Sequence, residues 1–267
     1  MKNILVPIGT SPESFKTLQY AVDFASDFSA IIYVMEVFNV VSPGAGSLAS
    51  ATDKIEKNNR EQLLTIIKKV DAKGVEIKIA TYQGNLIDGL KKIDLEYLGI
   101  DLIIIAPRSN DVNEENYLGD TSGKIVKRTD IPTLIVPKGY EYKPLKSILT
   151  AFKSGILKRK RILNPLIDIK KKYNSTIHLL LVKTPGYSDD DLRVHTALLD
   201  ISTKMTLTEN PTTYLGVLEH FQTKHPDLLC VFRRKRGFFK KLWEKNTIAK
   251  SEFYAPIPVL VLSVKKD

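Results

Sequence analysis

The chain of 267 residues has a single cysteine and no long apolar run, and both absences limit what it can be. One cysteine, Cys230, excludes an internal disulfide and is typical of a reducing compartment. No stretch approaches the roughly 18 apolar residues that a membrane-spanning helix needs. The apolar run at residues 4–6 is too short for the central region of a signal peptide. We therefore expect a cytoplasmic protein without a transmembrane segment.

Residue patterns typical of catalytic and metal sites are also missing. The i, i+4 spacing of helical zinc ligands is absent among the histidines, which are His178, His195, His220 and His225. Cys230 lies in an apolar run, where cysteine packs as a small apolar side chain. The acidic residues 189–191 follow Pro185 and Gly186 and are typical of a helix start. We expect no catalytic residue, no metal site and no enzyme.

Charge is divided unevenly along the chain. Lys and Arg number 40 against 30 Asp and Glu, which gives a net charge of +10. Residues 1–142 hold 16 basic and 19 acidic side chains, a net −3, whereas residues 143–267 hold 24 and 11, a net +13. Hydrophobic residues make up 43%, enough for an ordinary core. A basic second half points either to an acidic partner or to a solvated surface.

The first half of the chain has the pattern of an α/β fold. Short apolar or alternating runs predict strands at residues 4–8, 31–35, 75–79, 101–105 and 131–136. Helical spacing predicts helices between them, beginning near residue 11 and then near residues 51–72, 86–97 and 119–128. Strands that alternate with helices pair in parallel, through right-handed crossovers.

The second half repeats this order. Its strands are expected at residues 146–150, 176–182, 227–231 and 257–262. Asp227 follows Asp101 by 126 residues, and Ile257 follows Ile131 by the same interval. Such ordered self-similarity indicates a duplication. We expect two domains, residues 1–140 and 144–267, which we call repeat one and repeat two.

Repeat two is shorter than repeat one. The opening strands lie 144 residues apart and the closing strands 126, so repeat two lacks about 18 residues. We place this deletion in the loop and helix after its second strand. Pro165 falls inside the first expected helix of repeat two and predicts a kink or a late start there.

Several of these features together resemble the universal stress protein family. They are the opening run at residues 4–7 with a helix start after it, the strand at 101–105 and the closing Ile-Pro-x-Leu-Ile-Val strand at 131–136. The likeness extends over nearly the whole chain as two copies. It implies two tandem doubly wound domains, each a five-stranded parallel sheet. The nucleotide cleft would lie outside the carboxyl ends of strands one and four, where open α/β sheets bind ligands.

The resemblance also shows that the nucleotide motif of repeat one has degenerated. Nucleotide-binding members carry Gly-x2-Gly-x9-Gly-Ser/Thr after strand four, because glycine lets backbone approach phosphate at a helix N-terminus. A carboxylate now occupies the last of these positions, and at about 4 Å it would repel a phosphate charge by roughly 1–4 kcal/mol. The family's acidic residue after strand one is replaced by glycine. The degenerate cleft comprises Gly9, Thr10, Ser11, Ala106, Arg108, Ser109, Gly119, Asp120 and Thr121.

Repeat two keeps none of the motif glycines. The same four positions fall on Phe232, Lys235, Lys245 and Asn246. Basic residues gather after its first and fourth strands, which the topology makes neighbours. They form a candidate anion site of Lys153, Arg233, Arg234 and Lys235. Three hypotheses stay open for this face: solvated surface charge, a specific anion site, or contact with nucleic acid or an anionic membrane.

Together these patterns predict a non-catalytic stress-response or regulatory binding protein with no required cofactor and an unidentified protein partner. Family dimers commonly form through the last strand, so the resemblance implies an intramolecular pseudo-dimer, with a homodimer also open. Two alternatives remain. One is binding of ATP or another adenine nucleotide by repeat one, with weak hydrolysis. The other is binding of nucleic acid or an acidic partner by repeat two.

Overall fold

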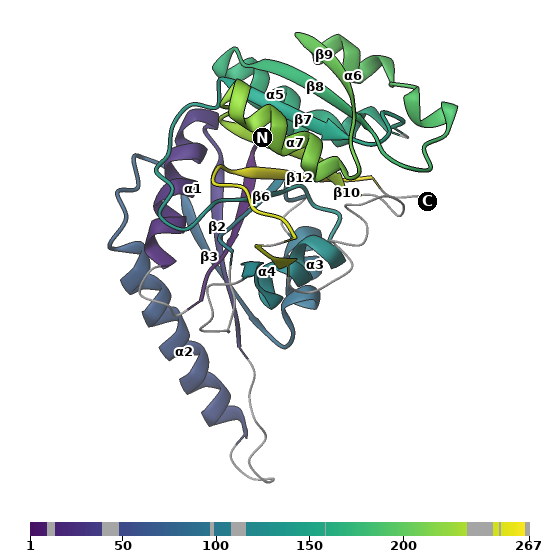
Figure 1. Ribbon diagram of the computed structural model, residues 1–267. Coiled ribbons are helices and arrows are strands. Elements are labelled where there is room, and N and C mark those ends of the chain that lie inside the picture. Colours follow the sequence, from purple (N-terminus) through teal and green to yellow (C-terminus); the bar gives the residue numbers. More distant parts are fainter. Residues whose placement is uncertain are drawn as a thin grey trace. The chain divides into compact units, whose positions relative to one another are not determined.

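The computed structural model is a mixed α/β structure with mostly parallel strands (Figure 1). It describes residues 1–9, 14–38, 48–96, 99–107, 116–157, 159–233, 248–250 and 252–264. The chain forms two compact units: unit 1 is residues 1–105 with 138–142, and unit 2 is residues 106–137 with 143–267. The closing segment of repeat one, residues 106–137, therefore groups with repeat two.

Unit 1 is a parallel sheet with a helix after each of its first three strands. The sheet order is β3-β2-β1-β4, and every pair in it is parallel. In chain order its elements are β1 (Asn3–Pro7), α1 (Ser14–Phe28), β2 (Ile31–Phe38), α2 (Leu48–Ile67), β3 (Ile77–Gln83), α3 (Leu86–Glu96) and β4 (Leu102–Ile105).

The helices of unit 1 cover both faces of its sheet. Thr81 in β3 donates its hydroxyl to Glu56 of α2 at 3.2 Å, so this residue points toward α2. The next residue, Tyr82, lies against Gly89 of α3, where an added Cβ would come within 2.7 Å of its ring. Successive strand residues point to opposite faces, so α2 and α3 lie on opposite sides. This explains why β4 reads as a continuous apolar run, buried at every position.

The linker after repeat one packs on α1. Tyr20 of α1 lies 6.3 Å from Tyr140 and 5.5 Å from Tyr142 between ring centroids. Phe24 faces Tyr142 edge-on, and the Tyr142 hydroxyl donates to the carboxylate of Asp27. Aromatic pairs of this kind each contribute about 0.5–1.5 kcal/mol beyond area burial. The linker is therefore anchored to α1 and belongs to unit 1.

Unit 2 contains a six-stranded sheet of order β6-β12-β10-β7-β8-β9. The strands from β12 to β9 pair in parallel, and β6 joins antiparallel to β12. Figure 1 shows α7 lying across one face of these strands. In chain order the elements are β5 (Asn116–Leu118), α4 (Asp120–Arg128), β6 (Thr133–Ile135), β7 (Ser147–Phe152), η1 (Lys160–Leu163), α5 (Asn164–Tyr173), β8 (Thr176–Lys183), η2 (Asp189–Leu192), α6 (Thr196–Ile201), β9 (Lys204–Glu209), α7 (Thr213–Lys224), β10 (Leu228–Arg233), β11 (Ile248–Ala249) and β12 (Val259–Ser263).

The differences between the repeats follow the sequence expectations. Helix α5 begins at Asn164 with Pro165 in its first turn, the late start that proline predicts. Helix α6 has 6 residues where α2 has 20, which accounts for most of the shortening. The acidic residues 189–191 open η2 with a capping box on Ser188.

Helix α4 has no counterpart in the described part of repeat two. Between β11 and β12 the described residues form a turn and extended chain. In repeat one the corresponding stretch is the nine-residue helix α4. Repeat two therefore presents no helix N-terminus in residues 248–250 and 252–258. Within the described ranges, no helix is both long and apolar enough to cross a membrane.

Candidate functional site

The candidate cleft of repeat one begins where two neighbouring strands end. Strands β1 and β4 pair in parallel, with Ile4 opposite Leu102 and Leu5 opposite Ile103. Their carboxyl ends therefore share one edge of the unit 1 sheet, as the sequence predicted. Gly9 follows β1 by two residues, and Ala106 directly follows β4.

The turn after β1 is tied to the start of α1. Ser14, the first residue of that helix, donates its hydroxyl to the Gly9 carbonyl at 2.8 Å. Ser14 is 4% exposed, so this bond is shielded from water. The Gly9 carbonyl consequently has an internal partner. Thr10 and Ser11, between these two residues, lie outside the described part of the chain.

Ala106 is joined to the first turn of α4. Ser122 donates its hydroxyl to the Ala106 carbonyl at 2.7 Å and is 1% exposed. This bond joins Ala106 to the N-terminal turn of α4, within unit 2. Among the predicted site residues, Ala106, Gly119, Asp120 and Thr121 are thus close together in unit 2. The bond keeps the Ser122 hydroxyl turned toward protein backbone.

The N-terminus of α4 has both an attractive and a repulsive feature for an anion. Gly119 caps the helix with φ −79° and ψ 173°, and this N-cap residue has no side chain to accept from the first-turn N–H groups. Such N–H groups attract anions. Asp120 is the first helical residue, however, and its carboxylate pairs with Lys124 at 2.5 Å. The helix start therefore already carries its own anion, partly neutralised.

A buried carboxyl near the carboxyl edge of unit 1 was not found by sequence analysis. Glu36 lies in β2 opposite Thr81 of β3 and is 7% exposed. Its Oε2 has no hydrogen-bond partner among the described residues. Burial raises the pKa of the Glu36 carboxyl. The signal was available, since Glu36 is the single charged residue in the otherwise apolar run of β2.

Two predicted anion-site residues of repeat two lie on neighbouring strands. Strands β7 and β10 pair in parallel with a constant register, from Leu228 opposite Ile148 to Val231 opposite Ala151. The same register sets Lys153, just beyond β7, opposite Arg233, the last residue of β10. The carboxyl ends of β7 and β10 therefore lie side by side, whereas the basic residues 234–236 that follow β10 lie outside the described part of the chain.

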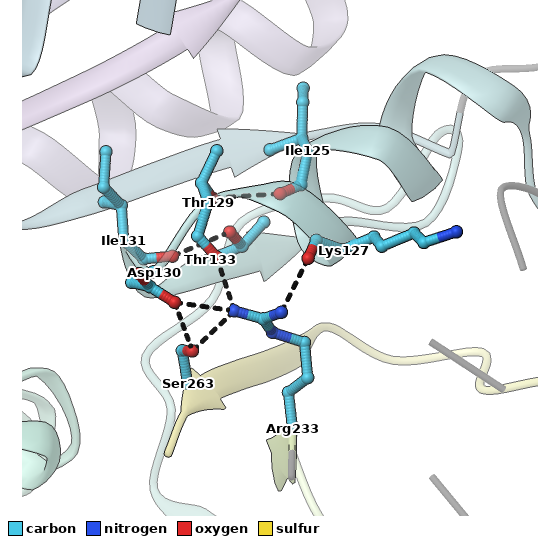
Figure 2. A network of polar contacts seen from close by, with 8 residues as sticks. All are labelled: Ile125, Lys127, Thr129, Asp130, Ile131, Thr133, Arg233 and Ser263. Carbon is cyan, nitrogen blue, oxygen red and sulfur yellow. Dashed lines mark hydrogen bonds and ion pairs between the residues drawn. The ribbon is translucent and has the colours of Figure 1, made fainter. Parts of the chain in front are cut away.

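The Arg233 side chain is engaged by protein acceptors (Figure 2). Its Nη1 donates to the Lys127 carbonyl at 2.6 Å, and its Nη2 to the Thr129 carbonyl at 2.7 Å. Nη2 also contacts Asp130 at 2.9 Å and the Ser263 hydroxyl at 2.6 Å. Burial lowers the pKa of the guanidinium, and the Asp130 charge opposes that shift. We call these five residues the Arg233 network.

The remaining predicted site residues cannot be placed. Arg108, Ser109, Arg234 and Lys235 lie outside the described residues, so their part of both candidate sites stays a prediction. Within the described ranges, no group of three or more His, Cys, Asp or Glu residues could hold a metal ion. Cys230 is buried in β10, and burial raises the pKa of its thiol. A thiol held protonated is a poor nucleophile.

The fold and the strand-end site define an α/β protein of the doubly wound class. The model of the universal stress protein family matches residues 1–137, about half of the chain. The chain belongs to this family.

Relatives extend the comparison to the whole chain. A universal stress protein of Methanocaldococcus jannaschii is 24% identical over 141 residues, which are 51% of this chain and 82% of that protein. The crystal structure of a universal stress protein from Archaeoglobus fulgidus superimposes with a TM-score of 0.71 at 17% identity, covering 98% of both chains. A putative universal stress protein from Pseudomonas aeruginosa gives 0.55 at 14% identity, covering 98% of this chain and 93% of that one. At these identities the structures establish the fold of both repeats.

Proposed function

We propose that this chain is a non-catalytic regulatory member of its family, which acts by binding a protein partner instead of turning over a nucleotide. The observation that carries the proposal is the start of α4. Asp120 stands there as a charged first residue paired with Lys124, in the place where the family resemblance puts a phosphate-contacting hydroxyl. An anion arriving at this turn would meet a carboxylate.

Two further observations support the proposal. The nearby Ser122 hydroxyl donates to the Ala106 carbonyl and is buried, so it is held away from a ligand at the helix start. In repeat two, the motif positions Lys245 and Asn246 carry no glycine, and their structure lies outside the described residues. We further propose a cytoplasmic location, since the one cysteine is buried and reduced.

Calorimetric titration with ATP and Mg²⁺ tests the proposal on the full chain. The unaltered protein should show no saturable heat and no rise in Tm, because a ligand at 100 times its Kd adds about 2.7 kcal/mol. A matched variant restores the motif through Ala106→Gly, Ser109→Gly and Asp120→Ser and should gain affinity. Asp200→Ser, at an exposed position of α6, serves as the control. Tight, Mg²⁺-dependent ATP binding by the unaltered chain would refute the proposal.

A second candidate is adenine-nucleotide binding through repeat one. It is favoured by Gly119, an N-cap residue that has no side chain to accept from the first-turn N–H groups of α4. In that case Asp120→Ser alone should strengthen binding at least tenfold, because one repulsive charge is removed. Weak hydrolysis by repeat one would be seen as phosphate release that the same variant increases.

A third candidate is binding of nucleic acid or another acidic partner by the basic face of repeat two. Lys153 and Arg233 lie in register on neighbouring strands, which gathers positive charge at one edge. Arg233 already bonds four protein acceptors, which favours a packing role for this residue. Retention on heparin that persists above physiological salt would support this candidate, because phosphate contacts weaken steeply with salt.

We also propose that the two repeats form an intramolecular pseudo-dimer. Support comes from the antiparallel pairing of their closing strands, β6 and β12, within unit 2. A molecular mass in solution equal to that of one chain would agree with closing strands that pair within the same chain.

A further inference from the structure

The closing strands of the two repeats pair in a symmetric register. Leu134 of β6 lies opposite Leu260 of β12, and these residues are 126 apart, the interval that relates the repeats. On either side, Ile135 faces Val259 and Thr133 faces Val261. Each closing strand therefore meets its own equivalent across a local two-fold axis. An edge of this kind is self-complementary, so the backbone ladder alone would accept either repeat as its partner.

The Arg233 network breaks this symmetry. The positions 126 residues away from its three side chains are all proline: Pro107 for Arg233, Pro137 for Ser263 and Pro256 for Asp130. Proline carries no side-chain donor or acceptor and no backbone N–H. The two-fold-related copy of the network therefore cannot form. The pairing therefore has a symmetric backbone ladder, but the Arg233 network exists on only one side of the two-fold axis.

Because the Arg233 side chain is mostly buried, the Arg233 network can discriminate between partner strands. The Arg233 side chain is 19% exposed and bonds two carbonyls, one carboxylate and one hydroxyl. In a pairing of two copies of repeat two, it would face Pro256 and lose the carboxylate. In a pairing of two copies of repeat one, Asp130 would face Pro107. Both pairings lose the Arg233–Asp130 ion pair and place a proline against one of its members, which is how specificity is built against competitors.

We propose that Arg233 is a partner-selecting residue, which makes the closing edge of repeat two specific for the α4–β6 segment of repeat one and prevents either repeat from pairing with its own kind. The occupant of this edge is residues 120–135 of the same chain. This selection holds whether or not either repeat binds a nucleotide, so it is independent of the proposed function.

Cysteines at the two-fold axis report which pairing has formed. Residues directly opposite in an antiparallel pair have Cα atoms about 4.5–5.5 Å apart, within the range of a disulfide. With Leu134→Cys alone, a disulfide forms only when two chains pair through their copies of repeat one. With Leu260→Cys alone, it forms only when two chains pair through their copies of repeat two. The double variant cross-links unlike repeats. Each protein is refolded under reducing conditions over a hundredfold range of concentration, then oxidised and separated without reductant.

With Arg233 present, the double variant should close an intrachain disulfide and both single variants should stay monomeric. Adding Arg233→Ala should raise the covalent dimer of each single variant at least tenfold at the highest concentration, and Arg233→Lys should restore part of the selectivity. Where Arg233→Ala does not fold, Asp130→Asn takes its place with the same expected direction. The native Cys230 is fully buried, so the parent chain should give no dimer.

Two controls separate selection from simple destabilisation. Val217→Ala removes buried methyl groups from α7, which packs against β7 and β8, and should leave the single variants monomeric. Arg193→Ala removes an exposed arginine and should also change nothing. The proposal is overturned if the single variants give as little dimer with Arg233→Ala as with Val217→Ala. It is equally overturned if they already dimerise with Arg233 intact.

Discussion

Asp101 and Asp227 make the same contact in their two units. Oδ2 of Asp101 accepts from the N–H groups of Lys2 and Asn3, at 2.6 and 3.1 Å. Oδ2 of Asp227 accepts from the two N–H groups at the start of β7, at 3.1 and 2.9 Å. Each carboxylate joins the residue before strand four to the beginning of strand one. The duplication therefore extends to side-chain hydrogen bonds at equivalent positions.

Replacing either aspartate with alanine should lower the free energy of unfolding by about 1–2 kcal/mol, since charged hydrogen bonds to N–H groups are lost at a partly exposed site. Asp227→Ala should cost more, because Asp227 also pairs with Lys143 at 2.8 Å. Urea denaturation measures both. Asp200→Ala, at an exposed position, should stay within about 0.5 kcal/mol. Equal effects of all three variants would show that neither aspartate contact stabilises the fold more than an exposed residue does.

Ser122→Ala should destabilise the first turn of α4. The Ser122 hydroxyl is buried and its acceptor, the Ala106 carbonyl, is partly buried, so the variant removes a partly shielded hydrogen bond at a cost of about 1–3 kcal/mol. Amide hydrogen exchange should speed up in the α4 N-terminal turn more than in α7. Thr121→Ala, one residue earlier, provides the comparison. If both variants exchange at the parent rate, the Ser122 bond does not hold the turn.

Glu36→Gln should stabilise the protein at neutral pH and not at acid pH. Burial raises the pKa of Glu36 in the folded state, so the folded state binds its proton more tightly than the unfolded state does. The favourable contribution of this group is complete below its unfolded pKa and is lost as pH rises through the raised folded pKa. Denaturation of both proteins from pH 4 to pH 7.5 measures the difference, and a gap that does not widen with pH would exclude the shift.

Asp130 and Arg233 should be strongly coupled. Arg233→Ala removes the donor of a partly buried network and should cost about 3–5 kcal/mol. Asp130→Ala should cost less, because the two carbonyls and the Ser263 hydroxyl still accept from the guanidinium. A double-mutant cycle should give a coupling of about 1–3 kcal/mol. Additive single effects would show that the ion pair itself carries no interaction energy.

Sequence analysis predicted the elements well where the signal is local. The alternation of short apolar strands with helices follows from burial of parallel strands on both faces, so β4 and β10 were expected at nearly their observed bounds. Pro165 predicted the late start of α5 because proline lacks the N–H that a helix interior needs. Helix α2 was placed about three to five residues late at each end, since a polar-faced helix has weak boundaries.

Sites were harder to predict because their partners are distant in the sequence. Arg233 was assigned to an anion site from its basic neighbours, and its acceptors lie 104 and 106 residues earlier in the chain. That site assignment stays a prediction, since Arg234 and Lys235 lie outside the described residues. Glu36 shows the reverse case: its position in an apolar strand was visible, but the lack of a partner for Oε2 is a property of the packed sheet.

The amino-acid sequence by itself determined the duplication, the succession of strands and helices along the chain and the replacement of the motif glycines, because periodicity, turn residues and repeat intervals can be read from the linear sequence. Only the tertiary structure decided that β6 meets β12 about Leu134 and Leu260, and that one arginine closes a contact which three prolines forbid on the other side. The physical reason is that hydrogen bonds depend on distance and direction in space, which the linear order of residues does not contain.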